Sequence, residues 1–331
     1  MMSHRAKVTI KILTTLGLLG FLAYQMDLRV LAEILMSANP LLLFLGALIQ
    51  LGSLVLSAVR WKTILRNFDI HARFLFLTRL NFIGYFFNLF LPSGIGGDFF
   101  RAFYLAKREG RGMETTVTTT MLERSAGLCA LLIIGTFFAA FQDLSVEGIR
   151  LFYVFSFMII LYLLGNLVLF HPWMHRRISS FLINRGLKHI EDKMELVYQG
   201  LNALQRNKRS ILEALMLSLV IQFFSVTIVW VTALSIGIDA PFRVFLIFVP
   251  LINLSIMVPL TINGIGLRES LFYLLFSQIG LPAELSVGLS LLAFFLYFLT
   301  AIPGLLVYSL YKKEGHLDEM AVEPVSLTPD P

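Results

Sequence analysis

Two adjacent charges, Glu123 and Arg124, lie in a segment that is otherwise apolar, about residues 116–141. If this segment spans a membrane, each charge costs about 2.5–3.5 kcal/mol unless it is paired or reaches water. Neighbouring residues of a helix point about 100° apart, so the two side chains cannot fully satisfy each other. We therefore expect partners elsewhere, and Asp98 and Arg101 are the nearest candidates. The alternative is that both side chains reach the membrane surface, since Glu123 lies about two turns from the start of the segment.

A second group of polar residues interrupts an apolar segment nearer the N-terminus. Its members are an amide, helix-breaking residues and two charges: Asn88, Pro92, Gly94, Gly96, Gly97, Asp98 and Arg101. Proline removes a backbone donor and glycine permits left-handed geometry, so a helix must open here. A helix that restarts near Asp98 would direct its N–H groups at an anion, and Arg101 would add a charged contact to phosphate. The alternative is a tight turn at the membrane surface, with Asp98 as a helix cap.

A similar group occurs in the C-terminal half of the chain. Its members are Asn253, Pro259, Asn263, Gly264, Gly266, Arg268 and Glu269. Both groups run from asparagine through proline and Gly-Ile-Gly to charged residues, so we interpret them as a diverged repeat. The alternative for this group is a structural loop in which Glu269 caps a helix.

The whole chain is too apolar for a soluble domain. Of its 331 residues, 57% are hydrophobic and only 15% are charged, and the mean hydropathy is +0.79. A globular domain is near half apolar and about a quarter charged, so lipid must cover the excess. Strand alternation is absent, so helices rather than a barrel must satisfy the backbone. The sequence predicts an all-α polytopic membrane protein, in which the single cysteine, Cys129, is a small packing residue.

Six apolar segments are long enough to span a membrane: 8–24, 40–59, 116–141, 151–170, 211–236 and 285–311. An amphipathic segment, 28–38, is expected to lie at the membrane surface. The two interrupted units, 80–110 and 242–280, are predicted to be re-entrant hairpins that return to the side from which they enter. These elements form one integral membrane domain, 1–313, followed by a short disordered tail, 314–331.

The lysines and arginines orient this arrangement. Most of the 27 become cytoplasmic if both termini, the basic stretch 60–79 and the basic loop 171–210 are cytoplasmic. Three full spans then separate the two hairpins, so the hairpins must enter the membrane from opposite faces. Such inverted pairs of broken helices are typical of secondary transporters. We expect the protein in the bacterial inner membrane.

Motifs of other functional classes are scarce. The sequence has no Walker lysine motif, no acidic metal-binding pair, no Gly-x-Ser-x-Gly elbow and no clustered histidines. We therefore expect no cofactor and no metal, and nothing indicates an enzyme. The net charge of +6 arises from the loops between apolar segments, so nucleic acid is not an expected partner. The basic loop 171–210 is instead expected to contact anionic lipid.

Two ordered motifs resemble those of a known family. Residues 88–101, followed by Leu-Glu-Arg at 122–124, resemble the first signature of the flippase-like, lysylphosphatidylglycerol synthase transmembrane-domain family. The family's second signature, a proline followed by Gly-x-Gly-x-Arg-Glu, is similar to Pro259 and residues 264–269. The resemblance covers nearly the whole chain. The acidic residue before the first arginine is commonly glutamate in the family, and here it is Asp98.

The resemblance implies a protein that moves a polar-headed lipid, anionic or polyprenyl-linked, across the membrane. The predicted substrate path is lined by Asn88, Asp98, Arg101, Glu123, Arg124, Asn253, Asn263, Arg268 and Glu269. Synthase members also carry a soluble aminoacyl-transferase domain, for which we see no counterpart, so synthase activity is not expected. Two alternatives stay open. One is a membrane-embedded transferase that modifies a lipid, and the other is a non-catalytic scaffold whose partner is an envelope-synthesis enzyme.

Overall fold

The computed structural model describes residues 4–90, 96–170, 172–188, 191, 194–195, 198, 207–258, 260–261 and 263–313. Three predicted helix breakers, Pro92, Gly94 and Pro259, and the predicted tail 314–331 lie outside these residues. Nearly all of the described chain is helical, which confirms the all-α fold class.

The N-terminal half contains α1 (His4–Gln25), α2 (Leu28–Ser37), α3 (Pro40–Leu65), η1 (Arg66–Phe68), α4 (Phe74–Phe90), α5 (Gly96–Glu109) and α6 (Met113–Ala140). After a two-stranded hairpin, β1 (Ser145–Val146) and β2 (Ile149–Arg150), come α7 (Leu151–Phe170) and α8 (Pro172–Asn184). Further along the described chain come α10 (Lys208–Ser235), α11 (Phe242–Ile256), α12 (Leu267–Ser277) and α13 (Ala283–Lys313).

Among the described residues, four helices are long and apolar enough to cross a membrane. They are Pro40–Phe68, Met113–Ala140, Lys208–Ser235 and Ala283–Leu310, with mean hydropathies of 2.2, 1.5, 2.2 and 2.2. Each coincides with a predicted span. Within α1 and α7, the described apolar stretches are shorter, Leu13–Gln25 and Leu151–Leu167. The protein is thus a multi-pass membrane protein, while six spans and two re-entrant hairpins remain predictions.

The prediction for the end of α3 was wrong. The basic stretch 60–79 was assigned to a loop, but α3 continues to Leu65 and includes Arg60 and Trp61. Arg60 is 8% exposed and Trp61 is fully buried. The helix continues because Trp61, Ile64 and Leu65 extend its apolar face into the core.

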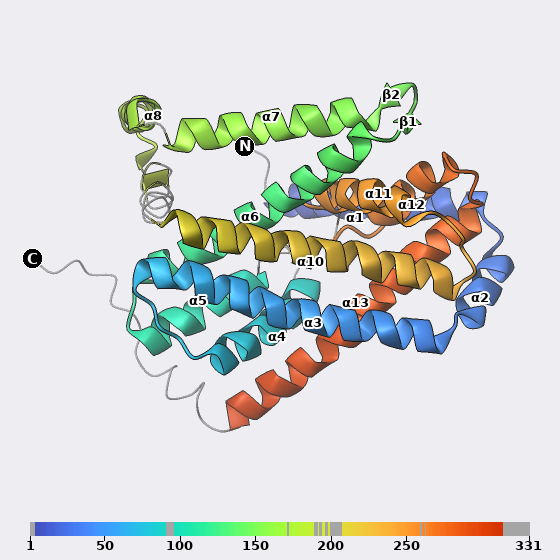
Figure 1. Ribbon diagram of the computed structural model, residues 1–331, viewed down its shortest axis with the longest axis horizontal. Helices are drawn as coiled ribbons and strands as arrows, with labels where there is room; N and C mark the ends of the chain where they lie inside the picture. The colour runs from blue at the N-terminus through green and yellow to red at the C-terminus, as the bar shows by residue number, and fades with distance from the viewer. Residues whose placement is uncertain are drawn as a thin grey trace, which may run out of the picture.

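The helices form a bundle in which α3 and α10 lie side by side, with α6 and α13 crossing them obliquely (Figure 1). Helix α4 packs against α3, α5 and α13, and α5 packs against α6. Helix α7 follows the β1–β2 hairpin at the end of α6, and α8 lies at the far end of α7, apart from α3 (Figure 1). The largest apolar core joins α6, α10, α11 and α12 around Phe245, Phe248 and Phe276.

The two interrupted units fold as helix pairs, and the second pair contacts the last turn of α4 in the first. The first pair is α4 and α5, and the second is α11 and α12. Asn263, at the tip of the second pair, donates from Nδ2 to the Leu89 carbonyl in the last turn of α4 at 2.8 Å. Asn263 has a φ of +52°, and Gly264 and Gly266 also have positive φ, so this tip needs residues that tolerate left-handed backbone.

A contact between Gly84 and Gly97 allows α4 and α5 to pack closely. A Cβ added to Gly97 would lie 1.8 Å from the Gly84 carbonyl oxygen, so no larger residue fits without separating the helices. Small residues of this kind let membrane helices approach closely. The contact holds the start of α5, with its charges, against α4.

Replacing Gly97 with alanine should therefore destabilise the fold by about 1–3 kcal/mol, because α5 must move. Gly52→Ala is the matched control, since nothing lies within 4 Å of its added Cβ, and alanine in a helix is favoured by roughly 0.5–1 kcal/mol. Thermal unfolding in detergent measures both. Equal melting temperatures for the two variants would contradict the close α4–α5 contact.

Candidate functional site

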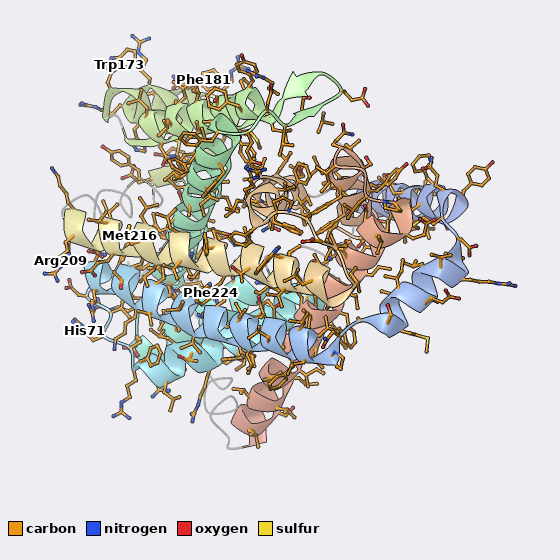
Figure 2. All side chains as sticks on the ribbon, turned by 45° about the vertical axis from the view of Figure 1, so that its right-hand side comes forward. His71, Trp173, Phe181, Arg209, Met216 and Phe224 are labelled. Atoms are coloured by element: carbon orange, nitrogen blue, oxygen red, sulfur yellow. The ribbon has the colours of Figure 1, made fainter. Side chains whose placement is uncertain are left out.

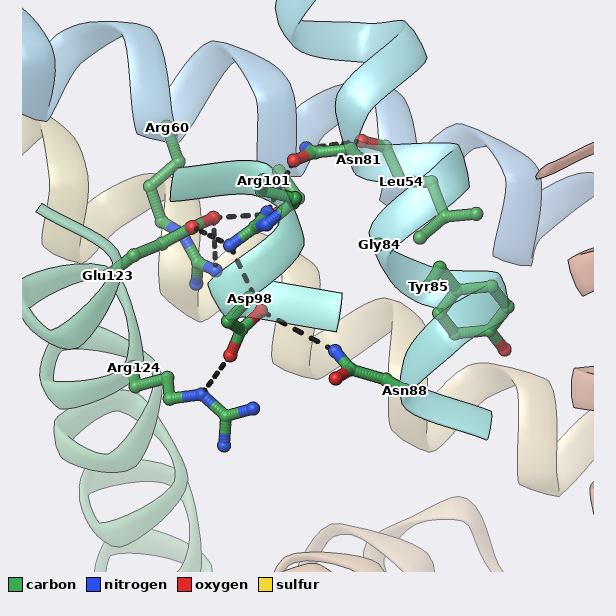
Figure 3. A pocket seen from close by; sticks show the side chains of 11 residues that line it. Leu54, Arg60, Asn81, Gly84, Tyr85, Asn88, Asp98, Arg101, Glu123 and Arg124 are labelled. Atoms are coloured by element: carbon green, nitrogen blue, oxygen red, sulfur yellow. Dashed lines mark hydrogen bonds and ion pairs between the residues drawn. The ribbon is translucent and has the colours of Figure 1, made fainter. Parts of the chain in front are cut away.

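A polar pocket of about 210 Å³ lies among α3, α4, α5 and α6. Its lining consists of Leu54, Ser57, Arg60, Asn81, Gly84, Tyr85, Asn88, Asp98, Arg101, Glu123 and Arg124. Figure 3 shows the charged side chains converging from three helices on one point. Five charged side chains gathered in one pocket between membrane helices make this the leading candidate for a functional site.

Glu123 is the most deeply buried of these charges, at 2% exposure. Its Oε1 accepts from Arg60 Nη2 at 2.9 Å and from the Ser57 hydroxyl at 2.8 Å. Its Oε2 accepts from Arg101 Nη2 at 2.8 Å. The carboxylate therefore joins α3, α5 and α6 through charge-assisted hydrogen bonds, which are about twice as strong as neutral ones.

Asp98 forms the other half of the network. Its carboxylate accepts from Arg124 Nε, lies 3.3 Å from Arg101 Nη2, and accepts from Asn88 Nδ2 at 3.4 Å. The side chain of Arg124 is 39% exposed, whereas those of Arg101 and Asp98 are each 9% exposed. Arg124 thus forms the accessible edge of the pocket, with Asp98 between it and Arg101 (Figure 3).

Local sequence explains how these charges are positioned. The Gly97 N–H, at the start of α5, donates to Asn88 Oδ1 at 2.9 Å, so a side chain of α4 caps α5. Asp98 and Arg101 lie one turn apart on α5 and face the same side. On α6, the adjacent Glu123 and Arg124 point to different partners, as the 100° step of a helix requires.

Two guanidinium N–H groups in the pocket have no hydrogen-bond partner in the described part of the chain. They are the Nε groups of Arg60 and Arg101, both buried. The Arg60 Nη1 bonds the Ser218 hydroxyl at 3.0 Å, and Arg101 also bonds Asn81 and stacks on Trp61 at 4.7 Å. A buried donor without a partner costs about 1–3 kcal/mol, so the two arginines are held here at the expense of stability.

A second charged cluster lies at the start of α12. The Gly266 N–H donates to Glu269 Oε2 at 2.6 Å, so Glu269 caps this helix, as the structural alternative expected. The same carboxylate accepts from Arg268 Nη2 at 2.6 Å. Ser290 contacts both side chains, and Phe294 lies 4.2 Å below the Arg268 guanidinium. The two charges of this cluster, Arg268 and Glu269, are therefore paired with each other.

The structure distributes the predicted path residues over two regions. Five of them gather in the pocket: Asn88, Asp98, Arg101, Glu123 and Arg124. Arg268 and Glu269 form the second cluster. Asn253 donates to the Ser225 hydroxyl at 3.3 Å, and Asn263 donates to the Leu89 carbonyl in the last turn of α4. Of the helix breakers, Gly96 and Gly97 begin α5, and Gly264 and Gly266 precede α12.

Sequence reasoning missed Arg60, Ser57 and Asn81 as pocket residues. Arg60 was counted among loop charges, although apolar residues on its C-terminal side indicated that the helix continues. Ser57 and Asn81 carry no charge, and their role follows only from packing α3 and α4 against the charged helices.

Comparison of the sequence with known proteins identifies its family. A family model described as the lysylphosphatidylglycerol synthase TM region matches residues 8–304, and the chain belongs to this family. The chain is 27% identical over 323 residues to the UPF0104 membrane protein MJ1595 of Methanocaldococcus jannaschii, an alignment that covers 92% of this chain and 94% of that protein. No solved structure matches the chain. The family indicated by the two motifs is confirmed.

Glu123→Gln should destabilise the fold by about 3–5 kcal/mol, because it leaves Arg60 and Arg101 buried without their shared carboxylate. Glu213→Gln is the control, since its pair with Arg209 is solvent-exposed and worth at most about 1 kcal/mol. Thermal unfolding in detergent compares the two. A Glu123→Gln protein as stable as the control would show that the carboxylate does not hold these helices together.

Proposed function

We propose that the protein moves a membrane lipid with an anionic, polar head group from one leaflet to the other. The observation that carries the proposal is the pocket, in which apolar helices enclose three arginines and two carboxylates. Charged residues at such positions commonly mark substrate or ion paths in membrane proteins. The family description, which refers to the synthase of a phospholipid, supports a lipid-related role.

The charge of the pocket favours a head group with one negative charge. Its lining carries three guanidinium groups and two carboxylates, which gives a net charge of +1 over the described residues. A lipid phosphodiester carries one negative charge and would neutralise the pocket. Guanidinium groups also suit phosphate, because their donors form a planar fork that contacts two oxygens at once.

The size of the pocket agrees with this class of ligand. The pocket has a volume of about 210 Å³. A phosphate with a small attached group fits within this volume, whereas the acyl chains would stay in the surrounding lipid. Arg124, at the accessible edge, is the residue that an arriving phosphate would meet first.

The paired helix tips support a transport path rather than a static site. We propose that α4–α5 and α11–α12 are re-entrant hairpins that enter from opposite faces and meet inside the membrane. The contact between Asn263 and the Leu89 carbonyl supports their meeting. The distribution of lysine and arginine supports cytoplasmic termini in the bacterial inner membrane.

Helix α8 suits contact with the anionic surface of the membrane. Trp173 and Phe181 project from it, 52% and 56% exposed (Figure 2). Arg177 lies over the Trp173 ring at 4.6 Å, and Arg185 lies over the Phe181 ring at 5.3 Å. Aromatic and basic side chains in such pairs favour the lipid head-group region, so we propose that α8 binds anionic lipid.

Arg124→Ala should slow lipid movement by about tenfold to a hundredfold, because one charge-assisted contact to phosphate is worth about 1.5–3 kcal/mol. Folding should be largely spared, since Asp98 keeps Arg101 and Asn88 as partners. Arg124→Lys keeps the charge but loses the planar fork and should retain partial activity. The assay follows fluorescent phosphatidylglycerol in proteoliposomes, beside thermal unfolding.

Arg150→Ala serves as the control, because Arg150 and its partner Asp143 are exposed in the β1–β2 region. It should move lipid at the wild-type rate. An Arg124→Ala protein that is destabilised yet moves lipid at the wild-type rate would rule out a transport role for Arg124. If the wild-type protein moves no fluorescent phosphatidylglycerol, the proposed function is ruled out.

A further inference from the structure

Tyr85 connects the charged pocket with α13. Its ring lines the pocket, while its hydroxyl points away from the charges (Figure 3). That hydroxyl is buried and makes no hydrogen bond of normal geometry to any described residue. The polar side chains that face it are Gln50 of α3 and Thr300 and Tyr297 of α13. Gln50 and Thr300 are 8% and 3% exposed, so this polar group lies in the interior of the bundle.

The polar side chains continue from Tyr297 to the second charged cluster. Tyr297 faces Ser225 of α10 and Arg268 of α12. Ser225 in turn accepts from Asn253 of α11 at 3.3 Å. Arg268 is bonded to Glu269, at the cap of α12. Polar groups therefore succeed one another from the first pocket through five helices to the second cluster.

The side chains between the two charged clusters differ from the clusters themselves because they are neutral. Gln50, Tyr85, Thr300, Tyr297, Ser225 and Asn253 carry hydroxyls and amides but no charge at neutral pH. Packing alone does not require the Tyr85 hydroxyl, since a buried polar group without a partner costs about 1–3 kcal/mol and phenylalanine would fill the same place. A transport path needs sites that bind the cargo weakly enough to release it. Neutral donors meet this need better than arginines.

We propose that this line of neutral side chains, the tyrosine track, is the route by which the lipid head group passes between the two charged clusters. The inference rests on the proposed lipid transport and assigns Tyr85 and Tyr297 as head-group contacts. Their hydroxyls, with the amides of Gln50 and Asn253, would replace the water that hydrates the phosphate. The acyl chains would remain in lipid outside the bundle.

The test compares Tyr85→Phe and Tyr297→Phe with Tyr308→Phe in full-length protein. Tyr308 lies on α13 as well, but its ring packs against Phe87 and Phe100, away from the track, and phenylalanine keeps that packing. Fluorescent phosphatidylglycerol in vesicles of phosphatidylcholine and phosphatidylglycerol is the probe. Each track variant should slow its movement about fivefold through loss of one neutral hydrogen bond, and Tyr308→Phe should match wild type. All three should melt near the wild-type temperature.

The outcomes separate the track from the proposed function. If wild type moves lipid and Arg124→Ala slows it as predicted, while both track variants keep the wild-type rate, the track is wrong and the function stands. If wild type moves no lipid, the proposed function itself fails. Cross-linking gives a second readout that does not depend on rate. Phosphatidylglycerol with a photoreactive head group should label peptides containing Tyr85 and Tyr297, and labelling confined to the α5 and α6 peptides would overturn the track.

Discussion

A charge buried among apolar helices must meet an opposite charge, and Glu123 shows how far this requirement shapes the fold. Its two oxygens hold Arg60 of α3 and Arg101 of α5, so three helices must converge on one carboxylate of α6. Arg101 must then reach past Gly84 and stack on Trp61, which requires α4 and α5 to touch. The ion-pair network therefore depends on the close glycine contact between α4 and α5.

The two charged clusters differ in a way that suggests different roles. In the first, the positive charges exceed the negative ones, two buried Nε donors lack a partner among the described residues, and one arginine is accessible. In the second, Arg268 and Glu269 satisfy each other, and the carboxylate also caps α12. Under the proposed function, the first cluster is the one that receives the anionic head group. In the second cluster, Glu269 caps α12, and Arg268 lies at one end of the proposed tyrosine track.

The fold class and the main charged pairs were predictable because the physical signals are local or strong. Apolar length defines the spans, and the cost of an intramembrane charge implied partners for Glu123 and Arg124 near Asp98 and Arg101. The structure shows Glu123 bound to Arg101 and Arg124 bound to Asp98. Neutral groups were harder to predict. Nothing in the sequence alone indicates that Ser57 or Asn81 faces the charges, since this depends on how α3 and α4 pack.

The central claim, that the pocket binds a lipid head group with one negative charge, is tested most directly by the lipids that stay bound to the protein. Wild type and Arg124→Gln, extracted in native nanodiscs, would be compared by mass spectrometry of their co-purified lipids. The account predicts that singly anionic phospholipid is enriched around wild type relative to the bulk membrane, and that Arg124→Gln loses this enrichment because its pocket is neutral. Identical lipid compositions for the two proteins would contradict it.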